Sequence, residues 1–204
     1  LIAFIANITA IYNKQQENMM NRFIIADPKK CIGCHTCEVA CVVSHQQASQ
    51  DNLAIDQISE QNFQPRIHVV KGFSISTAVV CHQCEDAPCA NVCPNGAIIH
   101  NKDYYYVDQD KCIGCKTCVL ACPYGTMEVV SRPVMRKLTA LNTIEAFKAE
   151  ANKCDLCHHR AEGPACVEVC PTQALVCIDR DALEDMVKER RRKAAFETGA
   201  DLLF

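Results

Sequence analysis

The hydrophobic positions of the chain fall in short runs, separated by polar residues, glycines and prolines. Phe23 to Ala26 is a run with strand propensity that Asp27-Pro28 ends. Two hairpins are predicted, Arg66–Val70 with Ser74–Val80 around Lys71-Gly72, and Ile98–Ile99 with Tyr104–Val107 around Asn101-Lys102-Asp103. Further strands are predicted at Met127–Val130 and Leu175–Ile178. The pattern therefore favours an α+β fold of short β-hairpins.

Helical patterns are fewer. Asp181 to Phe196 is predicted to be a C-terminal helix, with Asp181 and Glu184 as a capping pair and a shared apolar face formed by Leu183, Met186, Val187 and Ala194. Its basic run, KERRRK at 188–193, suits a helix C-terminus and is either a solvated face or a docking site for an acidic partner. Asn142 to Ala151 is a short helix or an ordered loop. Elsewhere a single helical turn is expected between the strands.

Residues 1–12 are apolar, but they lack a basic leading region and a clear cleavage site, so they make a poor signal peptide. We expect residues 1–19 to be a non-native or flexible leader and the structured protein to begin near Met20. An amphipathic docking segment is the alternative.

Composition excludes some classes of protein. The 204 residues are 49% apolar and 22% charged, as in an ordinary globular protein. The formal net charge of -3 leaves no global basic footprint for nucleic acid. No run approaches the roughly 18 apolar residues of a membrane helix, so we expect a soluble protein without direct membrane insertion.

The cysteines form an internal repeat. Sixteen of the 17 fall into four quartets, each of which closes with a three-residue gap. The quartets are Cys31, Cys34, Cys37, Cys41; Cys81, Cys84, Cys89, Cys93; Cys112, Cys115, Cys118, Cys122; and Cys154, Cys157, Cys166, Cys170.

This spacing indicates iron–sulfur clusters. In the run CIGCKTCVLACP, Cys112 to Pro123, the first three cysteines can hold three irons of a cubane, and the fourth ligates the other cluster in two-cluster ferredoxins. Zinc ribbons would leave the third and fourth cysteines of each quartet unexplained. A secreted disulfide framework requires an oxidising compartment and usually a shorter chain. So many thiols favour a reducing, cytoplasmic location, or cofactor insertion there.

The gaps between quartets predict which of them pair. Residues 94–111 provide just one hairpin between the second and third quartets, whereas the other gaps are longer. We therefore expect an inner ferredoxin-like unit at 81–130, inserted into an outer unit made of 20–80 and 131–180, with 181–204 as helix and tail. Each unit then pairs one compact cysteine loop (CIGCHTC or CIGCKTC) with one expanded loop, which has more residues before its third cysteine (CHQCEDAPC or CDLCHHRAEGPAC).

Exchange of the fourth cysteine within each unit predicts four clusters. Their ligands are Cys31, Cys34, Cys37 and Cys170; Cys154, Cys157, Cys166 and Cys41; Cys81, Cys84, Cys89 and Cys122; and Cys112, Cys115, Cys118 and Cys93.

Other residues have ordinary interpretations. Gly33 and Gly114 are expected to adopt positive φ so that the cysteine loops can turn. Cys177 lies in a predicted strand and is interpreted as a buried, inert thiol. The histidines His35, His82, His158 and His159 are interpreted as partly exposed loop residues that at most tune a potential.

The motifs CIGCHTCEVACVVSHQ, CHQCEDAPCANVCPNGAI, CIGCKTCVLACPYG and KCDLCHHRAEGPACVEVCP resemble the iron–sulfur electron-transfer subunits of the molybdopterin oxidoreductase (dimethyl sulfoxide reductase) family. The similarity covers about Met20 to Phe196 and is closest to members that work with formate dehydrogenases. It implies four [4Fe-4S] clusters held by the sixteen cysteines. It also implies that electrons pass from a molybdenum or selenium formate dehydrogenase toward a hydrogenase or related redox subunit.

The glycines help to distinguish an electron relay from an enzyme with its own nucleotide-binding site. There are only 7, and none forms a G-x-G turn, so neither a dinucleotide-binding fold nor a P-loop is expected. We therefore predict an electron-transfer component without its own substrate site. The alternative is an accessory or maturation factor for formate dehydrogenase or hydrogenase assembly.

Overall fold

The computed structural model describes residues 21–48, 58–59, 62–137 and 143–200. Along the chain the elements are β1 (Phe23–Ala26), α2 (Thr36–Ala48), β2 (Ile67–Lys71), β3 (Ser76–Val80), α3 (Pro88–Asn91), β4 (Ile98–Asn101), β5 (Tyr104–Val107), α4 (Thr117–Ala121), β6 (Glu128–Lys137), β7 (Thr143–Asn152), α5 (Ala165–Glu168), β8 (Leu175–Ile178) and α6 (Arg180–Ala200).

The described strands form four two-stranded antiparallel sheets. Three of them, β2–β3, β4–β5 and β6–β7, join neighbours in sequence. The fourth joins β1 to β8, so that Ile24 lies opposite Cys177. This pairing brings the two ends of the cysteine-containing region together.

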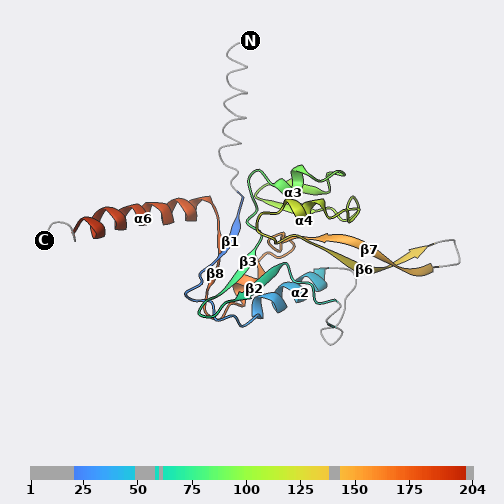
Figure 1. Cartoon of the computed structure of the whole chain (residues 1–204), viewed down its shortest axis with the longest axis horizontal. Coiled ribbons are helices and arrows are strands. Elements are labelled where there is room, and N and C mark those ends of the chain that lie inside the picture. The colour runs from blue at the N-terminus through green and yellow to red at the C-terminus, as the bar shows by residue number, and fades with distance from the viewer. Residues whose placement is uncertain (1–20, 49–57, 60–61, 138–142, 201–204) are drawn as a thin grey trace, which may run out of the picture.

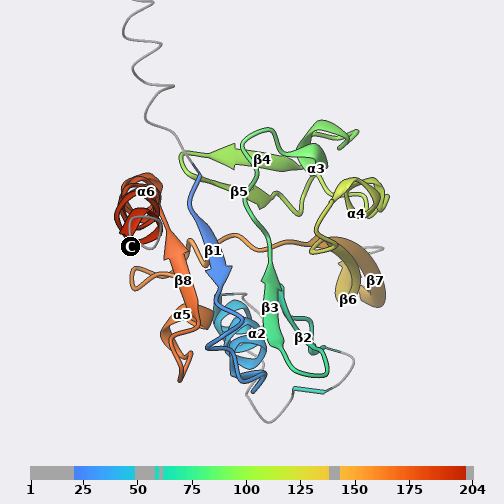
Figure 2. The ribbon, with the colours of Figure 1, turned by 60° about the vertical axis from the view of Figure 1, so that its left-hand side comes forward.

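The elements gather in two lobes, which Figure 2 separates clearly. The first, here called the α2 lobe, contains β1, α2, β2, β3, α5 and β8, and α2 packs against α5 within it. The second, the α4 lobe, contains α3, β4, β5 and α4, and α3 packs against α4. The chain therefore crosses from the first lobe to the second and returns.

Each lobe has a small core in which cysteines stand beside apolar side chains. Around Ile24, the first core includes Cys37, Cys41, Cys154 and Cys166. Around Ile98 and Met127, the second includes Cys89 and Cys118. Because small domains bury little apolar surface, such cores depend on additional constraints such as a bound metal.

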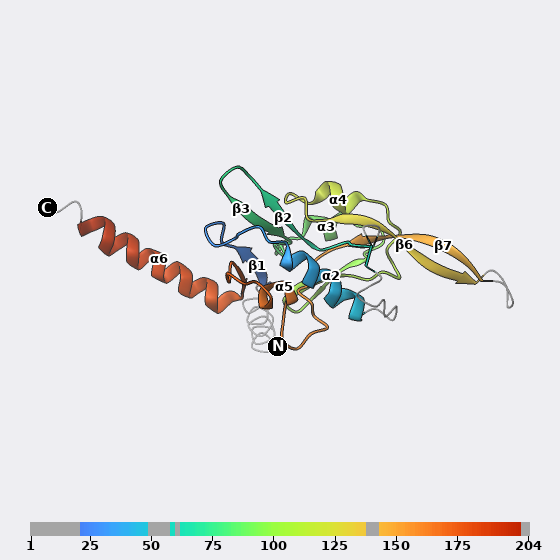
Figure 3. The same ribbon diagram turned by 90° about the horizontal axis from the view of Figure 1, so that it is seen from below.

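Two elements project from the body, on opposite sides in Figures 1 and 3. The ribbon of β6 and β7 extends beyond the α4 lobe, and α6 points away from the end of β8. Along α6 the side chains of residues 188–196 are exposed. Its basic run therefore stands clear of the body.

Several sequence predictions are confirmed. The fold is α+β with short antiparallel hairpins and a C-terminal helix. Strands β1 and β8 have the predicted bounds, and the hairpins β2–β3 and β4–β5 form where they were expected.

Other predictions are wrong. The prediction of a helix or loop at 142–151 fails over its described residues, because Thr143–Asn152 forms β7 against a strand β6 that runs on to Lys137. Cross-strand pairing here overrides the helix propensity of its Ala, Glu and Lys residues. Helix α2 has 13 residues rather than a single turn. The expectations for residues 1–19 lie outside the described residues.

The start of α6 also differs from the prediction. The carboxylate of Asp179 accepts a hydrogen bond from the backbone N–H of Ala182 at 2.9 Å. Asp179 is therefore the capping residue, in place of the expected pair of Asp181 and Glu184. Glu184 instead lies 3.3 Å from Arg180, one helical turn away.

Candidate metal centres

The structure gathers the sixteen quartet cysteines into four groups, each named here by its second cysteine. They are the Cys34 site (Cys31, Cys34, Cys37, Cys170), the Cys157 site (Cys154, Cys157, Cys166, Cys41), the Cys84 site (Cys81, Cys84, Cys89, Cys122) and the Cys115 site (Cys112, Cys115, Cys118, Cys93).

Three of these groups line cavities whose remaining walls are largely apolar. Val69, Ala78 and Leu175 complete the cavity of the Cys34 site. Val107, Val129 and Ala151 complete the cavity of the Cys115 site. The cavity of the Cys84 site is completed by Ala87, Tyr105, Met127 and Lys153, among others.

The fourth group, the Cys157 site, is buried throughout. Burial raises the pKa of Cys166 far above its usual range, and the negative charges of Cys41 and Cys157 raise it further. The pKa of Cys154 is likewise raised by burial, and then by the charges of Cys81 and Cys166. Cys41, Cys154 and Cys166 also lie together in the core around Ile24.

The compact cysteine loops turn where the sequence predicts. Gly33 has φ +65° and Gly114 has φ +66°, the positive values that were expected and that glycine adopts without steric strain. A helix starts directly afterwards, α2 at Thr36 and α4 at Thr117. The hydroxyl groups of these threonines lie 3.3 Å from the sulfur atoms of Cys34 and Cys115, respectively. The two loops therefore present their cysteines in the same way.

The fourth cysteine of each quartet has a fixed hydrogen-bond partner. Backbone N–H groups donate to three of these sulfur atoms at 3.3 Å, from Arg66 to Cys41, from Ala97 to Cys93 and from Ala174 to Cys170. The hydroxyl group of Thr126 lies 3.5 Å from the sulfur of Cys122. Such bonds favour the thiolate form, which is the form that ligates a metal.

The donor set fits an iron–sulfur cluster. Burial raises the pKa of Cys37, Cys41 and Cys89 to about 11. Grouped thiolates in such surroundings require positive charge nearby, because buried negative charges repel one another. A site with four cysteine thiolates as ligands favours an iron–sulfur cluster or zinc.

Comparison with known proteins distinguishes these two. Two families described as 4Fe-4S binding domains match, at residues 28–43 and 105–128. A probable iron–sulfur protein of the Frd operon of Proteus vulgaris is 99% identical over 157 residues, covering 77% of this chain and all of the relative. "Electron transport protein HydN" of Escherichia coli K12 is 63% identical over 176 residues, covering 86% and 98%.

The chain belongs to this family of iron–sulfur electron-transport proteins. It carries [4Fe-4S] clusters in more than one motif, since the matched segments hold the complete first and third quartets. "Formate hydrogenlyase subunit 2" of the same E. coli strain is more distant, at 38% identity over 198 residues, and the match covers 88% of this chain and 92% of the relative.

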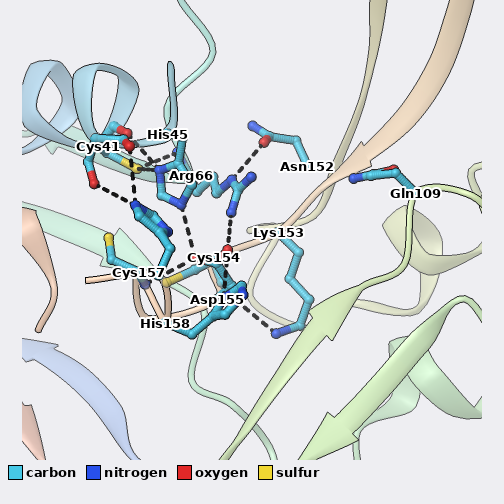
Figure 4. A network of polar contacts seen from close by, with 12 residues as sticks. Cys41, His45, Arg66, Gln109, Asn152, Lys153, Cys154, Asp155, Cys157 and His158 are labelled. Carbon is cyan, nitrogen blue, oxygen red and sulfur yellow. Dashed lines mark hydrogen bonds and ion pairs between the residues drawn. The ribbon is translucent and has the colours of Figure 1, made fainter. Parts of the chain in front are cut away.

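A polar network surrounds the Cys157 site and was missed by sequence reasoning (Figure 4). Asp155 lies between Arg66, whose guanidinium nitrogen is 2.7 Å from one carboxylate oxygen, and His45, whose Nε2 is 3.0 Å from the other. Burial acts to raise the pKa of Asp155, but His45 and Arg66 outweigh it and hold that pKa well below its usual range. The network ties the loop of Cys154 and Cys157 to α2, which supplies Cys41.

Other histidines are also more engaged than predicted. His82 stacks on Tyr124 with ring centroids 4.0 Å apart, and burial lowers its pKa. His158 stacks on Tyr104 at 5.3 Å, and His159 lies 3.0 Å from the hydroxyl of Ser44. Only tertiary contacts could identify these partners. Cys177, interpreted as buried, is half-buried in β8, and burial raises its pKa.

The described part of the chain includes no helix with both the length and the apolar character needed to span a bilayer.

Proposed function

We propose that this protein is an electron relay with four [4Fe-4S] clusters, one held at each of the four sites. The observation that carries the proposal is the exchange of the fourth cysteine. Three cavities are each lined by three cysteines of one quartet and the last cysteine of another, which supports the ligand pattern of two-cluster ferredoxins. Each bound cluster would accept and donate one electron at a time.

Neighbouring sites support a linear order. Cys37 of the Cys34 site lies in the same core as Cys41, Cys154 and Cys166 of the Cys157 site, and this core also includes Cys81 of the Cys84 site. Cys89 of the Cys84 site and Cys118 of the Cys115 site share the other core. We therefore propose the order Cys34 site, Cys157 site, Cys84 site, Cys115 site.

Exposure of the ligands fits this order. Cys34 and Cys115 are exposed, and they belong to the two end sites, whereas the Cys157 site in the interior is entirely buried. Ile32 and Ile113, in the same compact loops, are 64% and 61% exposed. In our proposal partners make contact at these two ends, and the interior residues exclude water from the middle of the path.

The fold supports the proposed division into an outer unit, residues 20–80 and 131–180, and an inner unit, residues 81–130. Strands β1 and β8 pair, and α2 packs on α5, across the long sequence separation within the outer unit. Within the inner unit, α3 packs on α4 beside the β4–β5 hairpin.

The electron donor in this proposal is a formate dehydrogenase, and the acceptor is a hydrogenase or related redox subunit. The names of two relatives, an electron transport protein and a formate hydrogenlyase component, support it. The chain has no substrate site of its own in this scheme. We place the relay in the cytoplasm, where thiols remain reduced.

Metal analysis tests the number of clusters. Protein reconstituted anaerobically should hold about sixteen irons and sixteen sulfides per chain, four of each per cubane. A plateau near half this value would contradict the four-cluster relay.

Replacement of one exchanged ligand tests the grouping. In Cys122→Ser the cluster of the Cys84 site should be disturbed, and the cluster of the Cys115 site should keep its electron paramagnetic resonance signal. Cys177→Ser is the control, because Cys177 lies outside every site. Loss of the Cys115-site signal in Cys122→Ser would instead mean that each quartet binds its own cluster.

A further inference from the structure

Lys153 is a buried lysine between two of the sites. Only 3% of its surface is exposed. Its side chain lines the cavity of the Cys84 site, and its backbone precedes Cys154, a member of the Cys157 site. In Figure 4 the ammonium nitrogen of this side chain points toward the segment of Cys154 and Asp155. A lysine in this position contributes nothing to surface solubility.

Three acceptors surround the ammonium group. The Nζ atom donates to Oε1 of Gln83 at 2.9 Å, to the carbonyl oxygen of Tyr105 at 2.9 Å and to the carbonyl oxygen of Cys154 at 3.0 Å. An ammonium group has three N–H donors and no acceptor, so these bonds satisfy it as a cation. The same nitrogen lies 5.9 Å from the ring centroid of Tyr105, within the range of a cation–π contact.

Gln83 fixes this arrangement from the other side. It lies between Cys81 and Cys84, is 2% exposed, and donates from Nε2 to the carbonyl oxygen of Cys154 at 2.8 Å. Its Oε1 also accepts a bond from the backbone N–H of Tyr105 at 2.9 Å. Lys153 and Gln83 therefore hold the loop of the Cys84 site against Cys154, the first cysteine of the Cys157 site.

The ammonium group of Lys153 is a buried positive charge. Among the described residues none forms an ion pair with its ammonium group, although a buried cation is costly unless negative charge lies nearby. The Cys84 site supplies that charge when it is loaded, because four thiolates outweigh the positive charge of a cubane core. Reduction adds one further negative charge.

We propose that Lys153 is a positioning residue that raises the reduction potential of the cluster at the Cys84 site. A fixed interior cation stabilises the reduced, more negative cluster more than the oxidised one, and low local dielectric strengthens this effect. The effect falls on the Cys84 site, because Lys153 lines the cavity of that site. This inference rests on the proposed four-cluster grouping.

The test uses the full chain, loaded anaerobically, in redox titrations followed by electron paramagnetic resonance. Lys153→Met removes the charge and keeps the length of the side chain. Gln83→Glu keeps Lys153 and places a carboxylate beside its ammonium group, with loss of the bond that Gln83 Nε2 donates to Cys154. Lys153→Arg keeps the charge. Lys148→Met is the matched control, a partly exposed lysine of β7 that bonds to the carbonyl oxygen of Gln109.

In Lys153→Met and Gln83→Glu, the signal that Cys122→Ser assigns to the Cys84 site should titrate at a lower potential. The expected change is about tenfold in the reduction equilibrium, which is about 59 mV for one electron. Lys153→Arg and Lys148→Met should titrate as the unaltered protein does.

The proposal is wrong if neither neutralising variant shifts that potential, or if neither retains the cluster. Lys153 would then be a structural clamp only. Iron and sulfide content, measured on the same samples, separates this failure from a failure of the four-cluster grouping. A full complement of iron with an unshifted potential rejects the role of Lys153 and leaves the relay intact.

Discussion

Glycine at position 114 sets how closely the loop of the Cys115 site approaches the β6–β7 ribbon. A Cβ atom at this position would overlap the side chain of Ala149 and lie 2.9 Å from its carbonyl oxygen. Gly125 has a similar φ of +63°, but a Cβ atom there would meet nothing within 4 Å. Substitutions at the two glycines therefore distinguish the cost of a positive φ from the cost of a steric overlap.

Gly114→Ala should destabilise the protein more than Gly125→Ala does. Both substitutions cost about 1–2 kcal/mol for a side chain at positive φ, and only Gly114→Ala adds an overlap, which costs about 1–3 kcal/mol in packed surroundings. Thermal unfolding of the loaded protein measures the difference. Equal melting temperatures would show that β7 moves away from the loop freely.

At the scale of elements, the pairing of β1 with β8 closes the α2 lobe. Ile24 of β1 is 1% exposed and packs in the same core as Cys37, Cys41 and Cys154. Val176 of β8, by contrast, is 46% exposed. The inward-facing side of this two-stranded sheet thus supports the Cys34 and Cys157 sites directly.

Ile24→Ala should reduce the free energy of unfolding by about 2–5 kcal/mol, because it leaves a cavity in a core that cannot fully collapse around bound clusters. On heating, the signals of the Cys34 and Cys157 sites should be lost before those of the α4 lobe. Val176→Ala, with its exposed side chain, is the control and should change little. Simultaneous loss of all four signals would show that the two lobes unfold as one unit.

At the scale of the whole molecule, α6 offers a charged surface away from the cluster sites (Figures 1 and 3). Within it Lys188 and Arg192 form ion pairs with Asp185 and Glu189. Among the described residues, the neighbouring Arg190, Arg191 and Lys193 have no such carboxylate partner. Exposed charge of this kind increases the rate of encounter with an oppositely charged partner more than it increases affinity.

If the proposed formate dehydrogenase is the donor, exchange of Arg190, Arg191 and Lys193 for Glu should slow formate-dependent reduction of the clusters and flatten its dependence on salt. Reduction by dithionite should stay normal, since α6 lies apart from the sites. The corresponding exchange for Gln should give an intermediate rate. A partner reaction as fast as in the unaltered protein across a salt series would identify the basic run as a solvated helix face.

The sequence by itself determined the cluster type and the short strands. Cysteines at fixed spacing restrict the loop geometry locally, as at Gly33 and Gly114, and β1 and β8 are bounded by nearby turn residues. It did not determine β7, whose helix-forming residues become a strand only because β6 lies opposite. Nor could it identify the partners of Asp155 and Lys153, because hydrogen bonds between distant segments exist only once the chain has brought those segments together.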